Sequence, residues 1–189
     1  MAITQNNKKN VGALKGKVGG YAFFIPAGVS IPTDFTTALP AGAMNLGYVS
    51  EDGMTDSPEF ETEDHKDGNG QVVDTSQTGY AKTITATFIE HKADVLKVQY
   101  GFENVTDEKG VLTVKNKGEF GESGALVIEG VIKGTRALRK VYPSVTVTSL
   151  GESTMITGDL YGTETTFTAY PDSDGVYDYE YAASTETEV

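Results

Sequence analysis

Apolar and polar residues alternate along several short stretches of the chain. In residues 82–89, isoleucine, alanine and phenylalanine occupy every second position, and threonines occupy the positions between them. Residues 141–150 and 163–170 repeat this two-residue period. Because successive side chains of a strand point to opposite faces, each stretch predicts a strand with one buried face and one threonine-rich face in water.

Five further stretches predict strands of other kinds. Residues 124–134 are richer in apolar residues and indicate a more deeply buried strand. The remaining strand candidates are residues 20–25, 45–50, 111–115 and 176–182. Segments rich in glycine, aspartate and proline separate the strands, as expected for turns.

Residues 90–101 depart from the alternating pattern. Here Ala93, Leu96 and Tyr100 recur at helical spacing, and Gly101 suits the position just after a helix end. We expect one short helix that covers a face or an open end of the β structure. The fold class predicted is therefore mainly β, an antiparallel β-sandwich or small barrel of about seven to nine strands with one short α-helix.

Length and composition favour a single domain over residues 1–189, because two domains would each have a small core. The chain has no cysteine, which excludes a disulfide framework and any thiolate metal site. No apolar run approaches the ~20 residues that span a bilayer, and the first twenty residues lack the apolar core of a signal peptide. We therefore expect no membrane segment and a protein made in the cytoplasm.

One long stretch, residues 51–79, is strongly acidic and contains a single lysine. Its nine carboxylates are Glu51, Asp52, Asp56, Glu59, Glu61, Glu63, Asp64, Asp67 and Asp74. Such a stretch buries little apolar surface, so we expect a long polar loop, and loops of this length are commonly functional or disordered. A further hypothesis is that the loop orders only on assembly; resistance of the free monomer to a Glu-specific protease would contradict it. The other irregular parts expected are an N-terminal arm, residues 1–19, and a C-terminal tail, residues 183–189.

The formal net charge is −12, and the charges are unevenly placed. Two basic groups stand apart from the acidic loop. They are Lys8, Lys9, Lys15 and Lys17 in the N-terminal arm, and Lys133, Arg136, Arg139 and Lys140 in a strand-like stretch. One interpretation is that these charged residues only keep the surface of a soluble protein hydrated. The other is that the acidic loop of one copy docks on a basic group of a neighbouring copy.

The sequence contains little that indicates catalysis. Residues 12–18 lack the glycine spacing and the final serine or threonine of a phosphate-binding loop. Neither His65 nor His91 has the setting of a hydrolase triad, and no serine lies in a nucleophile-elbow motif. Residues 64–70 and 171–175 lack the ligand spacing of a calcium loop, which leaves only adventitious calcium binding open. We expect no enzyme, no cofactor and no dedicated metal site, and the net charge also disfavours binding to DNA phosphates.

Five motifs follow one another over residues 10–182. They are KVGGYAFFIPAGVSIPTDFTTAL, LGYVSEDGMTDSPE, EHKADVLKVQYGFENVT, LRKVYPSVTVTSLGE and TTFTAYPDSDGVYDYEYA. Each motif is weak alone, but the ordered set resembles the major tail tube protein of long-tailed bacteriophages with non-contractile tails. That family has no catalytic position to carry over to this chain.

The resemblance implies a structural virion protein that is assembled in the host cytoplasm and located in the tail. It implies a homo-hexameric ring, stacking of rings into a tube, and joined sheets that line the bore through which the genome passes without sequence-specific binding. It implies the tape measure, tail tip and tail terminator proteins as partners. The loop at residues 51–79 would then reach from one ring to the next.

Two alternatives use the same residues differently. One is a monomeric β-sandwich module for adhesion or carbohydrate binding, which polar strands and long acidic loops also fit. The other is a tail terminator or connector on a related fold, which would form one ring and would not polymerise.

Overall fold

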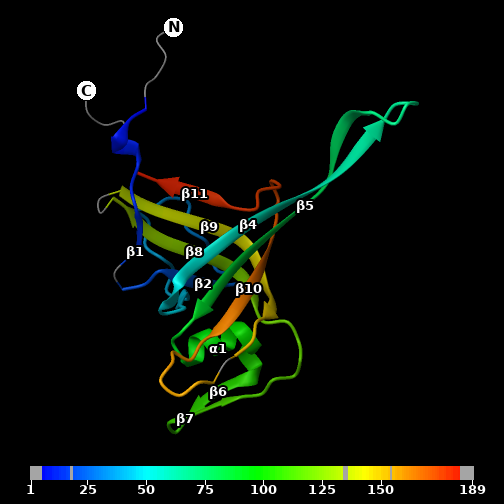
Figure 1. Cartoon of the computed structure of the whole chain (residues 1–189). Helices are drawn as coiled ribbons and strands as arrows, with labels where there is room; N and C mark the ends of the chain where they lie inside the picture. The colour runs from blue at the N-terminus through cyan, green and yellow to red at the C-terminus, as the bar shows by residue number, and fades with distance from the viewer. Residues whose placement is uncertain (1–5, 18, 134–135, 154, 184–189) are drawn as a thin grey trace.

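The computed structural model describes residues 6–17, 19–133, 136–153 and 155–183. An antiparallel sheet forms the body (Figure 1). Its order is β3 (Met44–Asn45), β2 (Ala22–Pro26), β8 (Ser123–Ile132), β9 (Arg136–Leu150), β10 (Thr163–Tyr170), β5 (Val72–Phe88) and β4 (Val49–Lys66). Two short strands complete it, since β1 (Leu14–Gly16) pairs with β8 and β11 (Tyr179–Ala182) pairs with β9.

The sheet curls towards a barrel. Its two end strands, β3 and β4, are consecutive in the chain and are joined only by residues 46–48. Within this short connection the amide of Leu46 donates to the carbonyl of Ala22 on β2, and the carbonyl of Tyr48 accepts from the amide of Ile89, just after β5. The connection thus holds the two ends of the sheet close together.

The predicted alternation is confirmed on the central strands. Ile84, Ala86 and Phe88 of β5 are buried, as are Val145 and Val147 of β9, and they join one core inside the curled sheet. A second, smaller core lies on the outer face of β2, β8 and β9, where residues 27–43 and β11 cover it.

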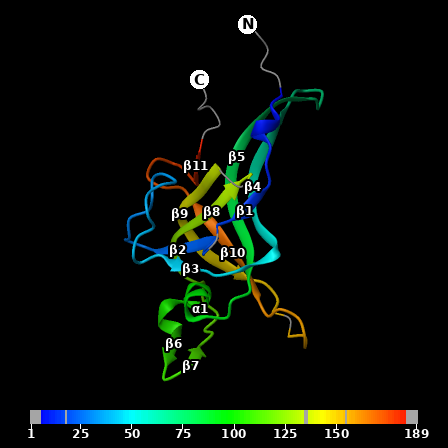
Figure 2. The same ribbon diagram turned by 90° about the vertical axis from the view of Figure 1, so that its left-hand side faces the viewer.

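One end of the curled sheet is closed by helix α1 (Ala93–Tyr100) (Figures 1 and 2). Its buried residues are Val95, Leu96, Val98 and Gln99, so the expected face through Ala93 and Tyr100 is only half-buried. Gly101 ends the helix at φ 96°, a backbone conformation that favours glycine. A 3-10 turn, η2 (Phe102–Asn104), leads to the hairpin of β6 (Val105–Glu108) and β7 (Val111–Val114), which lies beyond the helix.

The fold class predicted from the sequence is confirmed: the described part of the chain is mainly β and antiparallel and contains one α-helix. The N-terminal arm is less irregular than expected, because it contains the 3-10 turn η1 (Lys8–Asn10) and strand β1. Of the expected C-terminal tail, residues 184–189 lie outside the described residues. None of the helices in the described ranges is long and apolar enough to cross a membrane.

Candidate assembly surfaces

The acidic stretch forms a β-hairpin, and the expectation of an irregular loop is wrong. Strands β4 and β5 pair from Met54–Ala86 out to Lys66–Val72, and the outer part of the hairpin projects from the body as an arm (Figure 1). We call residues 59–80 the arm. It carries six of the nine acidic residues, whereas Glu51, Asp52 and Asp56 lie on the part of β4 that borders the body.

The arm turns at residues 67–71, and its tip is built by Asp67. One carboxylate oxygen of Asp67 accepts from the amides of Asn69 and Gln71, at 2.9 Å each. Its amide also donates to the carbonyl of Gln71, and Gly70 takes a φ of 83°. These hydrogen bonds, first that of Gln71, lower the pKa of Asp67 and keep the carboxylate charged. Asp67 therefore shapes the tip.

Turn chemistry and β-branched residues explain the hairpin. The sequence Asp-Gly-Asn-Gly at 67–70 supplies turn residues, and Val72, Val73 and Thr75 follow it on the returning strand. The high density of acidic residues in this stretch is the reason why the sequence predicts a loop. Acidic residues fit an exposed strand well, however, because nearly all of the arm's residues remain in water. The ordering of this stretch only on assembly stays a prediction.

An aromatic cluster fixes the base of the arm to the body. Phe60 of β4 and Tyr80 of β5 meet edge to face at a ring-centre distance of 5.0 Å. Tyr80 packs in the same manner on Tyr177, at 4.7 Å. Edge-to-face pairs at this spacing are favourable, so the cluster restrains the direction in which the arm leaves the sheet.

A charged network lies beneath the arm and uses two residues of the predicted interface. Asp56 forms ion pairs with Lys140 and, at 3.4 Å, with Lys82; both lysines also pair with Asp178. The Tyr142 hydroxyl donates to Asp56 at 2.8 Å. The expectation that Asp56 and Lys140 bind another copy is therefore not supported by their geometry, because each has partners within its own chain.

This network predicts a pH-dependent stability. Burial alone would raise the pKa of Asp56, but hydrogen bonds from Lys140 and Tyr142 outweigh it, and the pKa lies below its ordinary 3.8. Such an acid stabilises the fold above its unfolded-state pKa and loses that contribution as the pH falls through the folded-state value. We expect Asp56→Asn to lower the free energy of unfolding at neutral pH by ~1–3 kcal/mol.

Urea unfolding at a series of pH values checks this expectation. The wild-type midpoint should fall below about pH 4, and the Asp56→Asn midpoint should fall less over the same range. Parallel pH curves for the two proteins would contradict the role given to Asp56.

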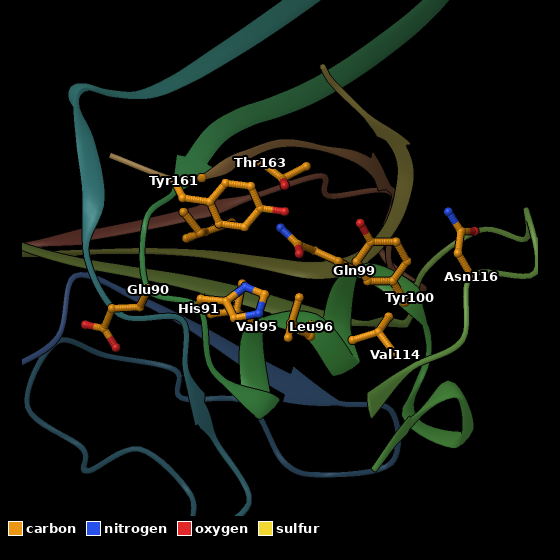
Figure 3. A pocket seen from close by; sticks show the side chains of 12 residues that line it. Glu90, His91, Val95, Leu96, Gln99, Tyr100, Val114, Asn116, Tyr161 and Thr163 are labelled. Carbon is orange, nitrogen blue, oxygen red and sulfur yellow. The ribbon is translucent and has the colours of Figure 1, made fainter. Parts of the chain in front are cut away.

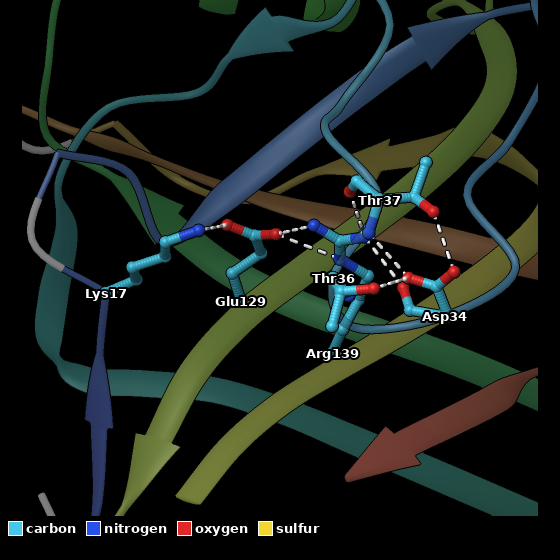
Figure 4. A network of polar contacts seen from close by, with 6 residues as sticks. All are labelled: Lys17, Asp34, Thr36, Thr37, Glu129 and Arg139. Atoms are coloured by element: carbon cyan, nitrogen blue, oxygen red, sulfur yellow. Dashed lines mark hydrogen bonds and ion pairs between the residues drawn. The ribbon is translucent and has the colours of Figure 1, made fainter. Parts of the chain in front are cut away.

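Lys17 and Arg139 belong to a second charged network, centred on Glu129 (Figure 4). Glu129 accepts from the Lys17 ammonium at 2.8 Å and from Arg139 Nε at 2.9 Å. Arg139 Nη1 also donates to the carbonyls of Asp34 and Thr37, at 2.7 Å each. Arg139 thereby ties the covering segment 27–43 to the sheet. The prediction that Arg139 forms an exposed interface is wrong, because its side chain is only 3% exposed.

The same segment has its own tight turn. The Asp34 carboxylate accepts from the hydroxyl and amide of Thr37 and from the amide and hydroxyl of Thr36. These bonds, first those of Thr37, hold the pKa of Asp34 well below its ordinary value. The turn places the two carbonyls that Arg139 reaches, and nothing in the alternation of the sequence indicates this contact.

The other basic residues are spread over one end of the molecule. Lys133 donates to the carbonyl of Lys8 at 3.2 Å, and Arg136 donates to the carbonyl of Ala183 at 3.1 Å. Lys8 and Lys15 are exposed and form no ion pair with any described residue. The side chain of Lys9 lies outside the described residues.

A hydroxyl-bearing face is left uncovered on the outside of the sheet. One cross-strand row runs through Ser57, Thr83, Thr168, Thr146 and Ser123 of five neighbouring strands. A parallel row contains Thr55, Thr85, Thr166 and Ser149. We call these two rows the hydroxyl face.

Hydrogen bonds link hydroxyls within the first row and from this row to Thr148, the next residue of β9 on the same face. Ser123 bonds Thr146 and Thr148 bonds Thr168, both at 2.7 Å. The residues that alternate onto this face within 55–59, 81–87, 146–148 and 164–168 include no lysine or arginine. The face is thus neutral to acidic and hydrated, and the threonine pattern in the sequence predicts it.

Comparison with known proteins identifies a family. A family model described as phage tail tube protein matches residues 3–185. No curated protein sequence matches the chain significantly.

Two solved structures are similar to the chain at low identity. One is the sheath-tube complex, in its extended state, of the extracellular contractile injection system PVC, at 12% identity and a TM-score of 0.45, covering 89% of this chain and 93% of the other. Another is the tube-terminating cap of the anti-feeding prophage, at 14% and 0.47, covering 97% and 100%. Because the family model spans nearly the whole chain, the protein belongs to the phage tail tube protein family and is a structural protein of a tail.

Proposed function

We propose that the chain forms hexameric rings that stack into a tail tube, and that the hydroxyl face lines the bore through which the genome is delivered. The observation that carries the proposal is this face itself. Five neighbouring strands present hydroxyls without a single cation among them, and no other part of the described chain covers them.

The chemistry of the hydroxyl face suits the passage of DNA. Proteins hold DNA mainly through lysine and arginine contacts to phosphates, and the released counterions drive that binding. A neutral to acidic wall offers no such contact, so a polyanion slides past it without adhering. Hydroxyls hydrogen-bonded to one another also keep the wall hydrated and smooth.

Labelling of an introduced cysteine tests this assignment, since the chain has no cysteine of its own. Thr168→Cys should react in the free monomer with both a small maleimide and one bearing a long poly(ethylene glycol) chain. In assembled tubes the small reagent should still react, whereas the long one should be excluded from the bore. Equal labelling of monomers and tubes by the long reagent would place the hydroxyl face on the outside.

The acidic arm is the proposed link between copies. The arm carries Glu59, Glu61 and Glu63 on one face of β4, because these residues alternate along the strand. They form no ion pair within the described part of the chain. In a ring, this row meets the basic N-terminal segment of an adjacent copy, where Lys8 and Lys15 are exposed.

Each exposed ion pair contributes only ~0.2–1 kcal/mol. Repetition around a closed ring and along many rings multiplies this small contribution, which then sets the register of the assembly. Among the described residues β4 pairs only with β5, and its other edge adds a second means of joining copies.

The other proposed partners are proteins that a tail tube would contact within the tail. We propose contacts with the tape measure, tail tip and tail terminator proteins, assembly in the host cytoplasm, a non-contractile tail and no catalytic role. Passage of genomic DNA requires no sequence-specific contact with this chain.

A further inference from the structure

The tip of the arm holds the pair Asn69–Gly70. Asn69 is the one asparagine of the sequence that a glycine follows, and each of the other six precedes a residue with a side chain. Because glycine has no Cβ, its amide nitrogen approaches the preceding side chain without a steric obstacle. Asparagine is also among the chemically labile residues. The pair thus combines a labile side-chain amide with an unhindered backbone nitrogen next to it.

The structure leaves this pair in water. Residues 68–71 are exposed. At Gly68 and Gly70 the space that a side chain would occupy is open, with no heavy atom within 4 Å apart from the adjacent residues. The tip also lies at the far end of the arm, away from the body (Figure 1). Solvent therefore reaches both the side chain of Asn69 and the backbone that follows it.

The turn holds the backbone nitrogen of Gly70 only weakly. Its amide donates to the carbonyl of Asp67 at 3.0 Å, so this hydrogen bond must open before the nitrogen can react. The ladder of the arm is irregular at this point, because its register shifts between His65 and Lys66. Exposed turns with few packed contacts are among the parts of a protein that open most easily. The tip therefore reaches a reactive arrangement by a local opening, without unfolding of the sheet.

We propose that Asn69 is a site of spontaneous deamidation in the folded protein. In the opened tip the amide nitrogen of Gly70 gives up its proton and attacks Cγ of Asn69, so that a bond forms between these two atoms. The bond from Cγ to Nδ2 then breaks, and Nδ2 takes up the proton and leaves as ammonia. Water opens the resulting cyclic imide at either carbonyl, which yields aspartate or isoaspartate. The reaction consumes one water and needs no oxidant, reductant or enzyme.

The neighbouring acid competes poorly in this reaction. Asp67 also precedes a glycine, but its carboxylate accepts from the amides of Asn69 and Gln71. These hydrogen bonds, first that of Gln71, keep the pKa of Asp67 low and the carboxylate ionised. An ionised carboxylate resists attack by a nucleophile, whereas the neutral amide of Asn69 has no such protection. Asn69 is therefore the reactive position of the tip.

The product changes the tip in two ways. Nδ2 of Asn69 donates to the Asp67 carboxylate at 3.4 Å, and deamidation puts a charged oxygen in place of this donor. The two carboxylates then repel each other. Isoaspartate also routes the main chain through the former side chain, which lengthens the turn and displaces the amide of Gln71 from Asp67. We expect a looser and more acidic tip.

Deamidation requires the folded chain alone and does not depend on the tube. Its consequence for assembly rests on the proposed function. The arm that joins copies gains a negative charge and loses a fixed turn as the protein ages. Each copy thus carries a slow chemical change in its own assembly arm.

Mass spectrometry of aged protein tests the site. The purified protein is kept for days at physiological pH and temperature and is then digested with a Glu-specific protease in mildly acidic buffer. Cleavage releases residues 64–90 and 109–119, each with a single asparagine, Asn69 and Asn116. The first peptide should convert from amide to acid at least about ten-fold faster than the second, because only Asn69 precedes glycine. The product should also become a substrate of isoaspartate methyltransferase.

Asn116 is a matched internal control. It is exposed and lies in a turn, where its Oδ1 accepts from the amide of Gly118 at 2.9 Å, but Lys117 follows it in the sequence. It lines the edge of a pocket that also contains Tyr100 of α1 and Val114 of β7 (Figure 3). Equal rates at the two asparagines, or an unchanged 64–90 peptide, would overturn the proposal.

The variant Asn69→Gln separates this site from others in the same peptide. Glutamine keeps an amide at the exposed tip, so the melting temperature should not change, but its longer side chain forms the imide far more slowly. The conversion should therefore disappear. A conversion that persists would assign the reaction to Gln71 or Gln77 and would overturn the proposal. Conversion without methylation by isoaspartate methyltransferase would contradict the imide route.

Trypsin cleavage after Lys66 reports the state of the tip. Aged wild-type protein should be cut there faster than fresh protein, and aged Asn69→Gln protein should be cut like fresh protein. Equal cleavage of fresh and aged wild type would contradict the looser tip. Absence of rings and tubes would refute the proposed function and leave the deamidation unaffected.

Discussion

Replacing Glu59, Glu61 and Glu63 with lysine is expected to abolish tube formation and to leave a soluble, folded monomer. The three side chains lie on one face of the arm in water, so the fold loses no buried contact. The change reverses the charge of that face, and it then repels the exposed Lys8 and Lys15 of the adjacent copy. Like-charge contacts repeated at every interface of a ring disfavour the whole assembly. Sedimentation of concentrated protein measures the loss.

A variant of equal charge change controls for net charge alone. Glu152, Asp174 and Glu180 are exposed and lie off the arm, so their replacement by lysine should leave tubes intact. Melting temperatures of the three proteins should agree within a few degrees. Normal tubes from the arm variant would show that the acidic face does not join copies.

Arg139→Ala is expected to cause the largest loss of stability of any single change at the sheet surface. Glu129 is 6% exposed and would lose its principal partner. The carbonyls of Asp34 and Thr37 would lose their donor as well. Breaking a buried ion pair by removing one partner costs about 3–5 kcal/mol, because the remaining charge stays buried. Urea unfolding of the two proteins at neutral pH measures the difference.

The double variant Glu129→Met/Arg139→Met separates the buried charge from simple loss of packing. It removes both charges and keeps apolar volume, so it should recover much of the stability lost in Arg139→Ala. An Arg139→Ala protein within 1 kcal/mol of wild type would contradict a structural role, and Arg139 would then return to the candidates for an exposed interface.

The strands that the sequence predicts well are those with one buried face. Val145, Val147 and Phe167 alternate with threonines because one side meets the core and the other meets water, and this pattern needs no knowledge of the partner strand. The hydroxyl face follows from the same alternation. The order of strands that brings the threonines into rows depends on long-range pairing and could not be predicted from the stretches alone.

The structure of the arm and the partners of Arg139 and Lys140 are not predicted by the pattern of charges along the chain. The acidic residues at 59–64 indicate solvent exposure, but exposure is compatible with both a loop and a hairpin. The turn sequence at 67–70 is the feature that favours the hairpin. Arg139 and Lys140 are adjacent in the sequence, yet their side chains point to opposite faces of β9 and meet Glu129 and Asp56. Such partners lie ten and 84 positions away, and only the folded sheet reveals them.

The most direct test of the tube is negative-stain electron microscopy of the purified protein, fresh and after concentration. The proposal predicts six-fold rings and stacks of rings with an open bore, and tubes that disappear in the arm variant. Rings that never stack would favour a terminator or connector role. Monomers alone, even with phage tail-tip extract added as a nucleus, would contradict the tube.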